Sequence, residues 1–169
     1  PLAGIVRGIA GGSLEQITKR LGILHALREL NVPIYNDARA IERSVDKSMT
    51  SFLLHKAGVA TPQAWAIEDE AQARRLLMRE TAAGRCLVLK PMFGSQGKGL
   101  RKVGWVKGEE GSDGEDGDAD GGRAVPLPDL KSVGGLAYLQ RFIPQPESEQ
   151  APGFDWRVMV IGGRAVAAM

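Results

Sequence analysis

The chain has 169 residues, of which 43% are hydrophobic and 25% are charged, and its formal net charge is +2. This composition is typical of a globular protein, and no apolar run reaches the ~20 residues that a membrane-spanning helix needs, so we expect no membrane partner. Cys86 is the single cysteine, which excludes an internal disulfide and favours a reducing, cytoplasmic compartment.

The first half of the chain has mainly helical patterns. Ser13 and Gln16 have the spacing of a capping box, and leucines and isoleucines recur behind them at helical spacing as far as Asn31. Gly58 and Gly84 end two later helical patterns. In chain order, we expect a helix over 14–30, a strand at 33–36, a helix over 37–43, a helix that begins at Ser44 or Asp46, a strand within 59–67 and a helix over 69–83.

The second half is predicted to be mainly strands, at 86–90, 100–106, 136–142, 156–161 and 164–169. Gly162-Gly163 between the last two is typical of a two-residue hairpin turn. Helices first and mostly antiparallel strands later indicate an α+β fold with at least two packing units. The chain stops at Met169 within a predicted strand, so we expect it to be a piece of a longer protein.

An acidic segment, 107–122, holds seven of the 20 acidic residues. Asp116, Asp118 and Asp120 match the first half of an EF-hand loop, but Leu127 stands where the bidentate glutamate is required. We therefore expect a disordered insertion and no metal ligands there. The remaining 22 basic and 13 acidic residues leave a charge of +9, which favours a nucleotide, polyphosphate or nucleic acid as partner.

The most informative segment follows the strand predicted at 86–90. The strand ends in Lys90, and a loop with Gly94, Gly97, Lys98 and Gly99 comes next. A lysine can meet a phosphate as a point charge, and glycines let backbone N–H groups approach phosphate oxygens. A Walker loop is excluded because Gly99 stands where Ser or Thr is required, and the glycine intervals do not fit a dinucleotide fingerprint. A phosphate flap and an ordinary glycine-rich hairpin loop are both open at this point.

Five pieces of the sequence, taken together and in this order, resemble the ATP-grasp superfamily, and within it the RimK-type α-L-glutamate ligases. They correspond to the end of an N-terminal domain, the entry helix, the lysine strand with its phosphate flap, the adenine hinge and the following hairpin. In this chain they are Arg7 with Gly11 to Gln16, Asp46-Lys47 with Ala57 to Pro62, Val88 to Pro91 with Gly94 to Gly99, Leu139 to Ile143, and Asp155 to Val158 with Val160 to Met169.

The resemblance implies an ATP-grasp fold that follows the tail of an N-terminal α/β (pre-ATP-grasp) domain. The implied domains are 1–43 for that tail, 44–139 for the first ATP-grasp subdomain with the disordered insertion 107–122, and 140–169 for the start of the second subdomain. The implied enzyme is a carbon–nitrogen ligase, which uses ATP to join an amino acid such as L-glutamate to a carboxylate acceptor through an acyl phosphate. A homo-oligomer is expected for the full-length protein.

The resemblance also assigns the site residues. Lys47 and Lys90 would hold the α- and β-phosphates, and Ser95, Gln96, Gly97 and Gly99 would belong to the flap. Gln140, Arg141, Phe142 and Ile143 would contact adenine, mostly through the backbone. Arg157 would be catalytic and face the transferring phosphate or the acceptor carboxylate, and Asp155 would position Arg157 or contact the ribose. One departure is Arg141, because the family usually has a glutamate after the hinge glutamine.

The family also uses Mg²⁺ or Mn²⁺, whose ligands would lie beyond Met169, so no metal ligand is assigned within the chain. We expect the isolated chain to bind nucleotide weakly and not to catalyse. Two alternatives are open: another ATP-grasp peptide ligase of the glutathione-synthetase type, or a non-enzymatic basic module that binds polyphosphate or nucleic acid. Nucleic acid is disfavoured, since only 5% of the residues are aromatic and could stack on bases.

Overall fold

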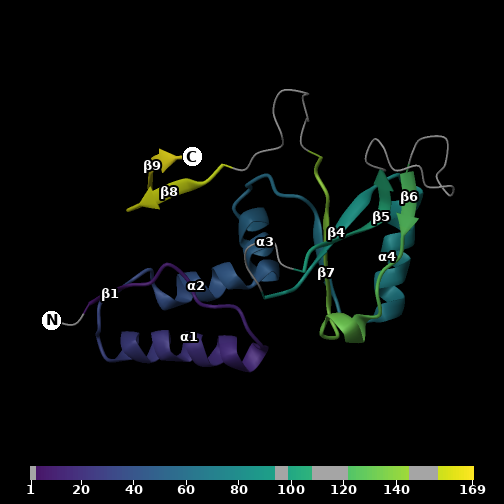
Figure 1. Cartoon of the computed structure of the whole chain (residues 1–169). Helices are drawn as coiled ribbons and strands as arrows, with labels where there is room; N and C mark the ends of the chain where they lie inside the picture. Colours follow the sequence, from purple (N-terminus) through teal and green to yellow (C-terminus); the bar gives the residue numbers. More distant parts are fainter. Residues whose placement is uncertain (1–2, 94–98, 108–121, 145–155) are drawn as a thin grey trace.

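The computed structural model of the chain describes residues 3–93, 99–107, 122–144 and 156–169 (Figure 1). The described part contains both helices and mostly antiparallel strands, as the sequence predicts. The helices are α1 (Leu14–Glu29), α2 (Ala38–Val45), α3 (Lys47–Lys56), α4 (Glu70–Ala82) and the 3-10 helix η1 (Leu130–Val133). The strands are β1 (Gly4–Ile5), β2 (Ile34–Tyr35), β3 (Ala64–Ile67), β4 (Cys86–Lys90), β5 (Arg101–Lys107), β6 (Gly122–Val125), β7 (Ala137–Arg141), β8 (Val158–Ile161) and β9 (Arg164–Ala168).

The N-terminal helices follow local capping signals. The backbone N–H of Ser13 donates to Gln16 Oε1 at 3.1 Å and that of Gln16 to Ser13 Oγ at 3.4 Å, so the predicted capping box is confirmed. The N-cap of α3 is Asp46, whose Oδ1 accepts from the N–H groups of Ser48 and Met49 at 2.8 and 3.0 Å. The alternative start at Ser44 is wrong because Ser44 lies within α2.

The central element is a five-stranded antiparallel sheet in the order β3-β7-β4-β5-β6. Strand β6 was not predicted, because its apolar part is only Ala124-Val125 after two glycines. Lys107 pairs with Gly122, so both end residues of the predicted insertion, 107–122, belong to strands, and the prediction of disorder is wrong for these two residues. The rest of that segment lies outside the described residues.

The two faces of the sheet differ. In β4, Leu87 and Leu89 are 0% and 2% exposed, whereas Cys86, Val88 and Lys90 are only partly buried. Successive side chains of a strand point to opposite faces, so the leucines form the core face and the other three form a more open face. Helix α4 covers the core face, and Figure 1 shows α3 on the opposite side of the sheet.

Gly104 allows β5 to lie close to α4. Its φ is +84°, and a Cβ there would lie 3.0 Å from the carbonyl oxygen of Arg85 and 3.3 Å from side-chain atoms of Leu77 and Thr81. Gly134 has nearly the same φ, +85°, but nothing lies within 4 Å of a Cβ built there. Substitutions at these two glycines therefore distinguish the cost of a positive φ from the cost of a steric clash.

We expect Gly104→Ala to lower the free energy of unfolding by about 2–4 kcal/mol, and Gly134→Ala by about 1 kcal/mol, because only the former adds a clash to the positive φ. Urea unfolding followed by circular dichroism measures both. Equal losses for the two variants would contradict the close approach of β5 to α4.

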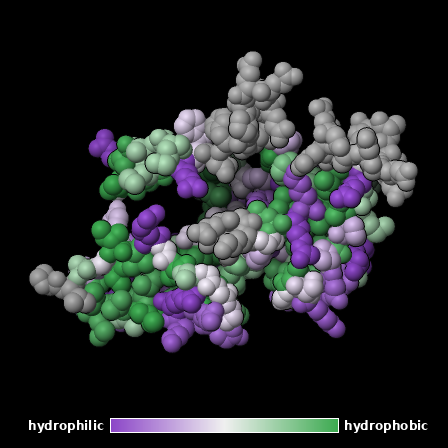
Figure 2. All heavy atoms as spheres, viewed as in Figure 1, coloured by the Kyte–Doolittle hydropathy of each residue, from purple (hydrophilic) through white to green (hydrophobic). Residues whose placement is uncertain are grey.

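The C-terminal hairpin, β8–β9, turns at Gly162 and Gly163, whose φ values of +57° and +76° fit the predicted two-residue turn. Its side chains are exposed, and it lies apart from the five-stranded sheet in Figure 1. Figure 2 shows apolar side chains gathered on this hairpin and around α1 and β1. Among the described helices, none combines the length and the apolar character needed to cross a bilayer.

Candidate functional site

The structure brings the two predicted phosphate lysines to the same end of the sheet. Lys90 is the last residue of β4, and Lys47 is the first residue of α3. The start of α3 is joined to the segment after β4, since Asp46 pairs with Phe93. The backbone N–H and the Nζ of Lys47 donate to the carbonyl oxygen of Met92 at 3.5 and 3.3 Å. A fixed backbone contact therefore holds Lys47 beside the end of the lysine strand.

Burial and mutual repulsion act on these two ammonium groups. Burial lowers the pKa of Lys47, and the charge of Lys90 lowers it further, while Asp46 acts in the opposite direction. Burial also lowers the pKa of Lys90. An anion placed between the two lysines would remove the repulsion and compensate for the lost hydration. The pair is therefore suited to hold a phosphate.

Lys90 also touches the predicted adenine hinge. Its Nζ donates to Gln140 Oε1 at 2.5 Å. The strand register explains the contact, because Gln140 is paired with Val88 and Tyr138 with Lys90, which places all four side chains on the same face of β4 and β7. The first hinge residue and the strand lysine are thus coupled directly.

The open face continues beyond this contact as a mixed apolar and cationic surface. Lys102 is paired with Val88, and its Nζ lies 4.7 Å from the centre of the Phe142 ring. Phe142 lies next to Cys86, whose carbonyl oxygen accepts its backbone N–H at 2.9 Å. A ligand with a flat apolar ring over Val88 and an anionic group near Lys90 would match both the apolar and the cationic side chains of this surface.

In the other hinge residues, backbone N–H groups bond to neighbouring strands, and the side chain of Arg141 contacts α4. The N–H groups of Arg141 and Phe142 donate to the carbonyl oxygens of Gln63 and Cys86, both at 2.9 Å. Contacts with adenine would therefore use other backbone groups of the hinge, such as those of Ile143. The Arg141 side chain points to the core face, where its Nε donates to Glu80 Oε2 at 2.8 Å.

Sequence reasoning missed the buried carboxylate of Glu80. Glu80 is 0% exposed, and its oxygens lie 2.7 Å from Arg85, 2.8 Å from Arg141 and 3.4 Å from Arg79. Burial raises the pKa of Glu80, but hydrogen bonds from Arg141 and Arg85 outweigh it and bring the pKa to about 2. A signal was present: Glu80 lies seven residues after Ala73, on the stripe of α4 that faces the core.

The remaining predicted residues are only partly described. Ser95, Gln96, Gly97 and Asp155 lie outside the described residues. Gly99 has φ +77°, and a Cβ there would lie 2.9 Å from Cγ of Pro91, so the chain returns closely past the end of β4.

Arg157 precedes β8, and its N–H donates to the carbonyl oxygen of Met169 at 2.8 Å. The β8–β9 hairpin, which Arg157 precedes, lies apart from the five-stranded sheet in Figure 1. Among the described residues, no three His, Cys, Asp or Glu side chains gather in a way that could hold a metal ion.

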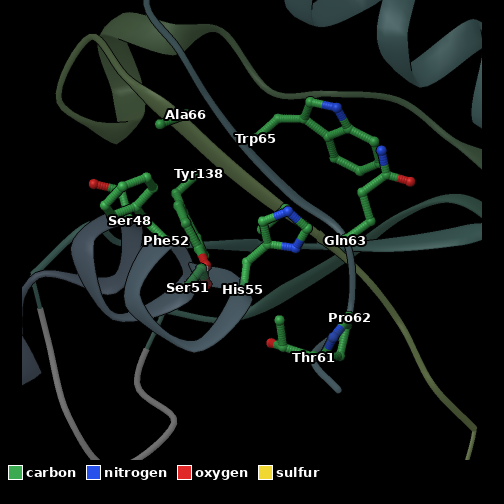
Figure 3. Close-up of a pocket in the computed structure, with 11 residues that line it drawn as sticks. Ser48, Ser51, Phe52, His55, Thr61, Pro62, Gln63, Trp65, Ala66 and Tyr138 are labelled. Atoms are coloured by element: carbon green, nitrogen blue, oxygen red, sulfur yellow. The ribbon is translucent and has the colours of Figure 1, made fainter. Parts of the chain in front are cut away.

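A cavity of about 610 Å³ adjoins the lysine end of the sheet, between α3 and the edge strand β3 (Figure 3). The hydroxyl groups of Ser51 and Tyr138 lie 2.6 Å apart on its wall and share a hydrogen bond. His55 and Phe52 of α3 line it as well, together with Ala64 and Ala66 of β3. Nothing in the sequence pattern predicted this cavity, because its walls come from elements far apart in the chain.

Comparisons with known proteins agree on one relationship. No family model matches the chain. It is 31% identical, over 98% of its length, to a tetrahydromethanopterin:α-L-glutamate ligase of Methanosarcina acetivorans, and 32% identical, over 97%, to the enzyme of that name from Methanococcus maripaludis. It covers 47% and 49% of these relatives, so it spans about half their length.

Among solved structures, the ATP-grasp ligase PsnB complexed with minimal precursor matches 99% of this chain with a TM-score of 0.50 and 19% sequence identity. The match covers 48% of the PsnB chain. At this identity the likeness concerns the fold, and it agrees with the α+β architecture described above.

Proposed function

We propose that the chain belongs to the ATP-grasp superfamily and carries the nucleotide-binding part of an ATP-dependent carboxylate–amine ligase, because it is similar in sequence to α-L-glutamate ligases and in fold to an ATP-grasp ligase. In this reaction a carboxylate oxygen attacks the γ-phosphorus of ATP and ADP leaves. The amine of the second substrate then attacks the acyl phosphate, loses a proton and releases phosphate, which leaves an amide. The proposed amine substrate is an amino acid such as L-glutamate.

The observation that carries the proposal is the convergence of Lys47 and Lys90 at one end of the open face. The two ammonium groups are partly buried and lie at one end of the open face, so together they would compensate the negative charge of a triphosphate bound there. The side chains of Val88 and Phe142 form an apolar surface on which the adenine base would lie. A ligand with both parts, a purine nucleotide, therefore fits this face better than inorganic polyphosphate or a nucleic-acid backbone.

The other predicted site residues keep their proposed roles. We propose that Ser95, Gln96, Gly97 and Gly99 cover the phosphates, and that Gln140, Arg141, Phe142 and Ile143 form the hinge beside adenine. Arg157 is proposed to meet the transferring phosphate or the acceptor carboxylate, with Asp155 as its positioning partner. These roles require the β8–β9 hairpin to approach β4 when the substrates are bound.

The domain division at residues 43 and 139, and a homo-oligomeric full-length protein, are proposals of the same kind. ATP-grasp ligases use ATP together with Mg²⁺, but the described residues contain no donor set that fits the metal. No step of the proposed chemistry is therefore assigned to a metal ligand of this chain.

A bulky side chain on the open face tests where the nucleotide binds. We expect Val88→Trp to weaken the binding of Mg-ATP at least tenfold, because the indole would occupy the space proposed for the base. Val59→Trp, at a residue that is 49% exposed after α3, is the matched control and should bind as the wild type does. Isothermal titration measures both. Unchanged affinity in a folded Val88→Trp variant would place the nucleotide elsewhere.

A further inference from the structure

The end of β7 is held by backbone hydrogen bonds on both sides and by the side-chain contacts of Arg141. The N–H of Arg141 donates to Gln63 on the side of β3, and the N–H of the next residue, Phe142, donates to Cys86 on the side of β4. The guanidinium group of Arg141 lies 5.6 Å from the centre of the Trp65 ring and donates two hydrogen bonds to Glu80, at 2.8 and 3.3 Å.

Glu80 connects this strand end to two other elements. Its carboxylate accepts from Arg85, which directly precedes β4, and from Arg79 on its own helix α4. Since Glu80 is fully buried, the carboxylate cannot exchange these partners for water without opening the core. The buried carboxylate therefore fixes the end of β7 relative to α4 and to the start of β4.

We infer that Arg141 is a positioning residue for the nucleotide, held by Glu80, and that it sets ATP affinity through its neighbours in the hinge. The inference rests on the proposed function. Arg141 itself faces the core side, whereas Gln140 and Phe142 on either side of it lie on the open face, where the nucleotide is proposed to bind. A displacement of Arg141 moves both of these side chains, and with Gln140 it releases the contact to Lys90.

The same geometry indicates why an arginine serves at this position. The guanidinium group is long and planar, so it reaches Glu80 with two N–H groups while it lies over the Trp65 ring. A lysine has one ammonium group and would keep the charge but lose the paired hydrogen bonds. Arg141→Lys should therefore keep part of the ATP affinity that Arg141→Met loses.

The experiment compares Arg141→Met, Arg141→Lys and Arg85→Met in steady-state kinetics of the full-length protein, each well below its melting temperature. Arg85 is the matched control, because it makes an equally short bond to Glu80 but is not in the hinge. We expect KM for ATP to rise about tenfold in Arg141→Met and about threefold in Arg141→Lys, with kcat within about twofold of wild type. In Arg85→Met, KM for ATP should stay at the wild-type value even though stability falls.

The experiment distinguishes a failure of the proposed function from a failure of the inference about Arg141. If wild-type protein binds no Mg-ATP, or if Lys90→Ala leaves its affinity unchanged, the proposed function is wrong. If the wild type binds ATP and loses it with Lys90→Ala, but KM for ATP is the same in Arg141→Met and Arg85→Met, Arg141 has only a structural role and the inference is overturned. If Arg141→Met does not fold, the comparison of Arg141→Lys with Arg85→Met decides in the same way.

Discussion

In the full-length protein, Lys90→Ala should lower the affinity for Mg-ATP, and with it the proposed ligase activity, by about 100-fold or more. Lys90 ends β4, lies partly buried beside Lys47 and donates to Gln140 at 2.5 Å. The alanine variant would leave the phosphates with one ammonium group in place of two, at a site where each charged contact is partly shielded from water. Equilibrium titration with Mg-ATP and a phosphate-release assay provide the two measurements.

Lys56→Ala is the control for this prediction. Lys56 is an exposed lysine in the last turn of α3, the helix that begins at Lys47, so its loss changes the net charge equally without touching the proposed site. We expect wild-type affinity in this variant. A similar loss in both variants would mean that general positive charge, and not a defined lysine pair, attracts the nucleotide.

Glu80→Ala should lower the free energy of unfolding by about 3 kcal/mol at neutral pH. The substitution leaves Arg141, Arg85 and Arg79 crowded together around a cavity without a counter-charge. Glu68→Ala, at an exposed residue between β3 and α4, should change stability by less than about 0.5 kcal/mol. Urea unfolding at pH 7 compares the two, and equal small losses would show that the buried cluster contributes nothing to stability.

The same carboxylate makes stability depend on pH in the acid range. The pKa of Glu80 is about 2 in the folded protein against 4.5 ordinarily, so the unfolded chain binds the proton first. The contribution of Glu80 is therefore complete above about pH 4.5 and is lost as pH falls toward 2. Over this window the wild type should lose on the order of 2 kcal/mol relative to Glu80→Gln, a figure reduced for the partial exposure of the arginines. Parallel stability curves would contradict the assignment.

Local signals were sufficient for much of the fold. The Ser13–Gln16 capping box, the Asp46 cap and the Gly162-Gly163 turn are each specified by residues close in sequence, and all three occur. Strands β1 and β6 were not predicted, because β1 has one apolar residue and β6 has two, too few for a periodic pattern. Both strands form by pairing with other strands, β1 with β2 and β6 with β5.

Local sequence signals predicted less of the candidate site than of the fold. Composition and spacing left both a phosphate flap and an ordinary hairpin loop open after Lys90. Lys47 meets Met92 across 45 residues, so only the family resemblance joined the two lysines. Glu80 was missed because a charged residue within a helical pattern is normally taken as solvent-facing. Its burial depends on Arg85 and Arg141, which come from other elements.

The most direct test of the proposal is the coupling of ATP cleavage to amide formation. Full-length protein is incubated with Mg-ATP, L-glutamate and, in turn, a pterin, a flavin cofactor or a protein tail that carries a carboxylate. The proposal predicts that ADP, phosphate and amide form in equal amounts with one of these acceptors, that omission of either substrate stops amide formation, and that Lys90→Ala abolishes it. Phosphate release that needs neither substrate, or amide formation that survives Lys90→Ala, would contradict it.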